Sequence, residues 1–152
     1  MSKSTVAAAN KIISNYTKAA AVAGLLPVPL LDAVLVSATQ LKMVQSLANV
    51  YGVPFSNTGG KAVIAALLGS VVPLSLRSSL MSLSKGVPVL GTVVGLAGMP
   101  ALSSWITFFI GRYFVDHFER GGTFADLDSE EMRAYLKSAK NKTTSSYAGV
   151  KP

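Results

Sequence analysis

Apolar residues recur along most of this chain at the spacing of a helix face, and nowhere do they alternate as in a strand. The first helix is predicted to start near Ser4 and to end near Gly24. Its polar face carries Lys11 and Lys18, which are seven residues apart. The opposite face is expected to be its dry side and carries Ile12, Tyr16, Ala19, Ala20 and Ala23.

The same periodicity predicts four further helical stretches, over residues 29–51, 61–84, 86–119 and 128–142. Pro29 suits the first turn of the second stretch, and Asp32 lies where a carboxylate favours the helix dipole. Gly121 and Gly122 form a natural stop before the last stretch.

The last helix has the clearest start signal in the chain. Asp128 and Glu131 have the spacing of a capping box, with Asp at the cap position. A short apolar stripe follows, formed by Met132, Tyr135, Leu136 and Ala139. We expect one helical domain over residues 1–142 and a disordered tail over residues 143–152.

No charged side chain lies between Lys85 and Arg112, a run of 26 residues. A helix needs about 20 mostly apolar residues to span a bilayer, so this run points to a membrane. Together with the apolar stretch before Arg77, it predicts a Gly/Pro-broken apolar helical hairpin over about residues 62–111. Three glycines in the run are candidates for close helix packing in lipid: Gly91, Gly95 and Gly98. The predicted fold is therefore all-α, a small bundle of amphipathic helices around this hairpin.

Composition supports the membrane interpretation. Only 14% of the 152 residues are charged, whereas about 25% is ordinary, and the mean hydropathy is +0.45. The net charge of +7 comes largely from lysines near the two ends, which suits an anionic lipid surface. The candidate lipid-surface residues are Lys11, Lys18, Lys137, Lys140 and Lys142. A nucleic-acid partner is not expected, because such a protein does not need the apolar middle.

No catalytic constellation stands out. The chain has no cysteine and a single histidine, His117, which is expected to be solvated at a helix end. The segment SNTGGKA lacks the first Gly and the Ser or Thr of a P-loop, and no cofactor or metal is expected. Asp32 is the acid nearest an apolar context, so it is a candidate functional acid, although its place at a helix start offers a simpler role.

Two segments resemble a bacterial family of helical domains that includes the YcjF-like inner-membrane proteins. They are PVPLLDAVLVSATQLKMVQSLANVYGVPFS and GRYFVDHFERGGTFADLDSEEMRAYL, and the similarity covers roughly residues 12–137. Members of that family occur alone or fused behind small GTPase domains. The resemblance implies membrane association and a link to GTPases, and it supplies no catalytic residues.

These observations predict a non-enzymatic, membrane-associated scaffold or partner protein, with a GTPase component or a second copy of itself as partners. We expect it at the bacterial inner membrane with both ends in the cytoplasm, as the positive-inside rule prefers. The N-terminal segment MSKSTVAAANKIISNYTK is not expected to be a signal peptide, so the mature chain should start at or near Met1. Two alternatives stay open. One is an oligomeric pore lined by Thr92, Ser103, Ser104 and Thr107. The other is a soluble helical module that binds a protein through its first two helices.

Overall fold

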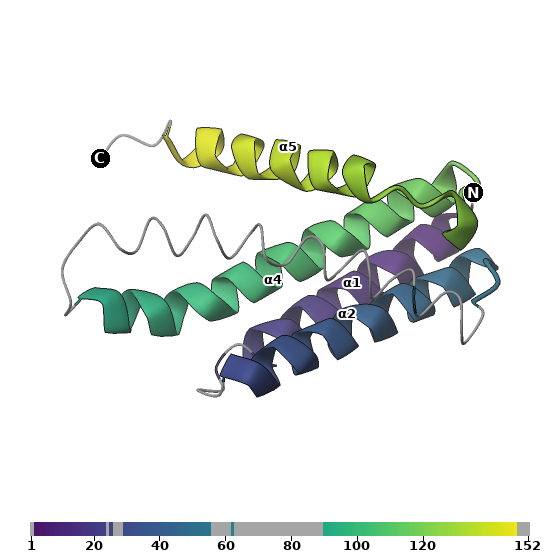
Figure 1. Ribbon diagram of the computed structural model, residues 1–152. Helices are drawn as coiled ribbons and strands as arrows, with labels where there is room; N and C mark the ends of the chain where they lie inside the picture. Colours follow the sequence, from purple (N-terminus) through teal and green to yellow (C-terminus); the bar gives the residue numbers. More distant parts are fainter. Residues whose placement is uncertain (1, 24, 26–28, 56–61, 63–89, 149–152) are drawn as a thin grey trace.

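The computed structural model describes residues 2–23, 25, 29–55, 62 and 90–148 (Figure 1). These residues form the helices α1 (Lys3–Ala23), α2 (Pro29–Tyr51), α4 (Leu90–Glu119) and α5 (Ser129–Ala148), with a 3₁₀ turn η1 (Phe124–Asp126). The described ranges contain no strand, so the predicted all-α class is confirmed. Residues 63–89 lie outside them and include nearly all of the first arm of the predicted hairpin, its tip at Arg77 and Lys85, and the first residues of its second arm.

Helices α1, α2 and α4 lie side by side along most of their length (Figure 1). Asn10 contacts Arg112 while Thr17 contacts Ser104, so α1 runs antiparallel to α4. Gln40 meets Thr107 and Tyr51 meets Glu119, so α2 runs parallel to α4. Helix α5 folds back over the last turns of α4, where Tyr135 lies 5.5 Å from Tyr113 between ring centroids.

The core lies where these helices meet. Its fully buried side chains come mainly from α2 and α4, including Met43, Leu47, Ile110 and Phe114. Gly111 sets the approach of α1 to α4, because a Cβ at this position would lie 2.8 Å from Cγ1 of Ile13. Only a glycine allows the two backbones to come so close without a shift of the Ile13 side chain.

A glycine follows the last residues of both α2 and α4, and the stop predicted at Gly121 is confirmed. Gly52 has φ of 69° and Gly121 has φ of 82°, a left-handed conformation that suits glycine. After each helix, two backbone N–H groups turn back to its last carbonyls. The Val53 N–H reaches the Ala48 carbonyl at 2.9 Å, and the Gly122 N–H reaches the His117 carbonyl at 3.0 Å. These bonds satisfy groups that a helix end otherwise leaves open.

The start of α5 follows the prediction only in part. Asp128 caps the helix, because its Oδ1 accepts the Glu130 N–H at 2.8 Å. The reciprocal half of the expected capping box is wrong, since Glu131 turns instead toward Arg120 and Tyr113. A complete capping box occurs one turn earlier, where Thr123 and Asp126 close η1.

Three expectations from the sequence need correction. Residues 143–148 were placed in a disordered tail but continue α5, because a helix once nucleated gains one hydrogen bond with each added residue. The buried face of α1 is formed by Ala9, Ile13 and Ala20, and Ala19 of the predicted face is exposed, because contact with α4 rotates the stripe. Pro100 lies inside α4 and does not end it.

Within the described part of the chain, none of the helices is both long enough and apolar enough to cross a membrane. Residues 90–111, the second arm of the predicted hairpin, form the first two-thirds of α4.

Candidate functional site

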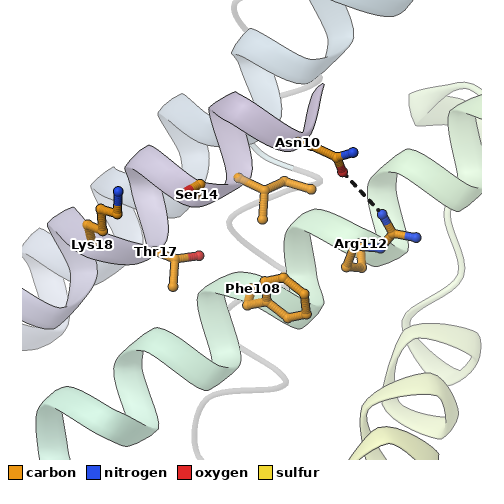
Figure 2. A pocket seen from close by; sticks show the side chains of 7 residues that line it. Asn10, Ser14, Thr17, Lys18, Phe108 and Arg112 are labelled. Carbon is orange, nitrogen blue, oxygen red and sulfur yellow. Dashed lines mark hydrogen bonds between the residues drawn. The ribbon is translucent and has the colours of Figure 1, made fainter. Parts of the chain in front are cut away.

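A groove of about 420 Å³ runs between α1 and α4 (Figure 2). Helix α1 contributes Asn10, Ile13, Ser14, Thr17 and Lys18, and α4 contributes Phe108 and Arg112. Ile13 is buried, whereas Phe108 leaves 42% of its surface exposed. The exposed ring of Phe108 gives the groove an apolar wall next to its polar and charged side chains.

The charged side chains that line this groove are both cations, Lys18 and Arg112. The Arg112 guanidinium donates to Asn10 Oδ1 at 3.3 Å and lies 4.0 Å from Asp116. Lys18 has no hydrogen-bond or ion-pair partner among the described residues. Since α1 contains no acidic residue, the groove presents a positive edge to solvent.

Buried polar groups lie close behind the groove. The Thr17 hydroxyl has no partner in the described structure, although the Thr17 carbonyl accepts a long bond of 3.5 Å from Ser104. Gln40 is fully buried and donates from Nε2 to the Thr107 hydroxyl at 3.5 Å, while its Oε1 has no partner there. The sequence analysis missed Gln40, although a glutamine on the dry face of an amphipathic helix is a visible signal.

A second hollow, of about 640 Å³, lies between α4 and α5 and is lined by charged groups and tyrosines. Arg120 forms an ion pair of 3.3 Å with Glu131, and the Tyr113 hydroxyl donates to the same carboxylate at 3.4 Å. The Tyr51 hydroxyl donates to Glu119 at 3.1 Å. These bonds tie α2 and α5 to the last turns of α4.

The environment of these groups shifts their proton affinities. Burial, followed by the neighbouring Glu119, raises the pKa of Tyr51 to about 12. Burial and the Glu131 carboxylate raise the pKa of Tyr113 to about 12 as well. Hydrogen bonds from the Thr123 side chain and backbone lower the pKa of Asp126. The raised pKa values keep the two tyrosine hydroxyls protonated, and able to donate, to a more alkaline pH than usual.

His117 is buried, with 6% of its surface exposed, so the expectation of a solvated histidine is wrong. Its Nε2 lies 2.9 Å from the Thr123 carbonyl oxygen, and its ring stacks on Tyr113. Gly122 packs directly on the imidazole, which leaves no space for a side chain at that position. The return of the chain after Gly121 therefore covers the histidine.

The end of the bundle where α1 stops exposes apolar side chains. Val22 is 66% exposed and Leu25 is 62% exposed, and Lys18 precedes them on the same side of α1. By the antiparallel register, the start of α4 lies at this end. In the sequence, residues 19–31 and 90–111 carry no charge, and Val22 and Leu25 are the large apolar side chains described as exposed at this end.

The structure describes the surroundings of some predicted site residues and not of others. Lys11, Lys18, Lys137 and Lys142 are exposed, as the lipid-surface prediction requires, while the side chain of Lys140 lies outside what is described. Asp32 is the fourth residue of α2, where a helix-start carboxylate is expected, and its surroundings also lie outside the description.

Gly91, Gly95 and Gly98 all belong to α4, but their packing falls outside the described surroundings, so their role stays a prediction. The glycine with a described close contact between two helices is Gly111, which lies beyond the predicted trio. In the described part of the chain, no three His, Asp or Glu side chains gather as a metal site.

Comparison with known proteins shows the family of the chain and one relative. The profile of the domain of unknown function DUF697 matches residues 2–145. The chain belongs to this family. It is 40% identical over 144 residues to "Magnetosome membrane protein 22" of Magnetospirillum gryphiswaldense (strain MSR-1), an alignment that covers 94% of this chain and 74% of the relative. No solved structure matches the chain.

Proposed function

We propose that this DUF697 chain is a membrane-associated helical protein that acts through contacts and has no catalytic activity of its own. The observation that carries the proposal is the uncharged end of the bundle, where Val22 and Leu25 are exposed beside Lys18. Apolar side chains next to a cation suit the boundary between lipid headgroups and acyl chains. The similarity to a protein named for a membrane supports the same conclusion.

The exposed lysines provide the electrostatic part of this contact. Lys11 and Lys18 are exposed on α1, and Lys137 and Lys142 are exposed on α5. Each cation near an anionic bilayer contributes about 1 kcal/mol before salt screens it. Membrane affinity should therefore fall as the salt concentration rises. The affinity that remains at high salt should be the part due to insertion of apolar side chains.

Cell fractionation followed by vesicle flotation tests the proposal. The protein should sediment with membranes, resist alkaline carbonate, and float with phosphatidylglycerol-containing vesicles. Flotation should be lost with Val22→Asp and Leu25→Asp together and kept with Val6→Asp, a matched control because Val6 is also exposed on α1. Recovery of the wild-type chain as a monodisperse soluble protein without detergent would reject membrane association and favour the soluble-module alternative.

The finer location and partners are part of the same proposal. We place the protein at the bacterial inner membrane with both ends in the cytoplasm, and we propose a GTPase component as one partner on the strength of the resemblance to domains fused behind GTPases. Protease added outside intact cells should cleave neither an N-terminal nor a C-terminal tag. Purified protein should turn over no nucleotide, and ion flux through protein-loaded vesicles would favour the pore alternative instead.

A further inference from the structure

The groove between α1 and α4 has the chemistry of a docking site, and its features point to one class of occupant. Its walls are apolar at Ile13 and Phe108, and the charges along it are Lys18 and Arg112. We propose that it binds an acidic amphipathic helix of a partner protein. This inference rests on the contact function proposed above, but not on membrane association.

The spacing of the two cations argues for a helix. Arg112 is fixed opposite Asn10 by a hydrogen bond of 3.3 Å, and Lys18 lies eight residues beyond Asn10 on α1. Eight residues of helix span about 12 Å. Two carboxylates seven residues apart on a partner helix are separated by about 10.5 Å, so they can face both cations at once. Apolar residues at the third and fourth positions between them would then lie over Phe108.

Other occupants fit this pattern less well. A single phospholipid headgroup is too small to contact Lys18 and Arg112 at once. A phospholipid with its headgroup at one of these cations and an acyl chain in the groove would leave the other cation without a partner. A second copy that docked through the same groove would bring Lys18 and Arg112 of one protomer against those of the other, and like charges across an interface are unfavourable. Asp116 lies beside Arg112 but does not line the groove.

Two features make the groove ready for a partner. Lys18 has no partner to give up among the described residues, and Arg112 retains donors beyond those used by Asn10 and Asp116. The side chains of Asn10 and Ser14 are exposed along the groove, where they can accept or donate further hydrogen bonds (Figure 2). The net charge of +7 would also speed the encounter with an acidic partner.

A fluorescent 18-residue helical peptide with Glu at positions 5 and 12 and Leu at positions 8 and 9 is the probe, used with the full chain. Its binding is measured by anisotropy at low and high salt, against a peptide with Lys in place of both Glu. The acidic peptide should bind more tightly, and salt should weaken it. Lys18→Glu should weaken binding roughly fivefold, and Lys11→Glu, the matched change on the same helix, should not.

Phe108→Ala should also weaken the acidic peptide, whereas Val6→Ala should leave it unchanged; thermal melts confirm that each variant folds. The proposal is overturned if the acidic peptide binds no better than the basic one, or if Lys11→Glu and Lys18→Glu act alike. It is equally overturned if these groove variants instead lose flotation with phosphatidylglycerol vesicles while peptide binding stays unchanged. If the wild-type chain binds the acidic peptide but does not bind membranes, only the membrane proposal is rejected.

Discussion

The two ends of this helical bundle differ in the charge and polarity of their side chains. Where α1 ends and α4 begins, Asp32 is the one charge among residues 19–38 and 90–111, and Val22 and Leu25 are exposed. At the other end, ion pairs and tyrosine–carboxylate bonds join α2, α4 and α5. Apolar exposure at the first end is unfavourable in water, whereas the second end is well solvated. Among the described residues, the contrast favours the first end over the second as the place of the proposed membrane contact.

The largest effect on stability is expected from Gly111→Ile. The new side chain would collide with Ile13, and overpacking of this kind costs about 1–3 kcal/mol or more. Thermal unfolding in detergent or buffer should show a drop of several degrees, roughly 2–4 °C for each kcal/mol. Gly95→Ile tests the apolar end in the same way, and an unchanged melting temperature there would count against a close helix contact at Gly95.

Asp128→Ala should be the next most costly change. It removes the cap that accepts the Glu130 N–H, and the loss of such a cap costs about 1 kcal/mol. Denaturant unfolding would measure the difference. Arg133→Ala is the control, because Arg133 is exposed in the same helix, and an equal loss in both variants would show that the cap is not responsible.

Alkaline pH should loosen the charged end. Since the folded pKa of Tyr51 and Tyr113 is about 12, above the usual value of 10, their protonated forms favour the fold. This contribution is complete below pH 10 and is lost as the pH rises to about 12. Tyr113→Phe should lower stability by about 1 kcal/mol or less at pH 7 and make the decline between pH 10 and 12 shallower. A decline of the same slope in wild type and variant would contradict the assignment.

Removal of residues 143–152 should have the smallest effect. Asn141 and Lys142, the last side chains of α5 before this segment whose burial is described, are exposed, and the sequence TTSSYAGVKP that follows is mostly polar. The free energy of unfolding should change by less than about 0.5 kcal/mol. A larger loss, measured by denaturant titration, would mean that the end of α5 packs against another element.

Local signals allowed much of the fold to be predicted from the sequence. Pro29 and Gly52 mark the bounds of α2, and Gly121 marks the end of α4, because each acts on its own backbone. The buried stripe of α5 at Met132, Leu136 and Ala139 follows in the same way from its spacing. These features are set by residues that are close together in the sequence, so the sequence pattern is enough to predict them.

What depends on helix crossings could not be predicted. The importance of Gly111 arises from the approach of Ile13, almost a hundred residues away, and no local pattern distinguishes it from Gly91 or Gly95. His117 looked solvated because its cover, Gly122, comes from the turn that follows. The groove between α1 and α4 could not be predicted either, because its two walls are about ninety residues apart in the sequence and come together only in the folded chain.

Depth-dependent fluorescence tests the central claim most directly. The chain has no cysteine, so single cysteines at Val6, Asn49 and Leu25 can each carry an environment-sensitive NBD label; Asn49 is exposed near the opposite end of the bundle. On addition of phosphatidylglycerol-containing vesicles, the label at position 25 should shift to the blue and brighten, and the labels at positions 6 and 49 should change little. No change at position 25, or equal changes at all three positions, would contradict a membrane contact through the apolar end.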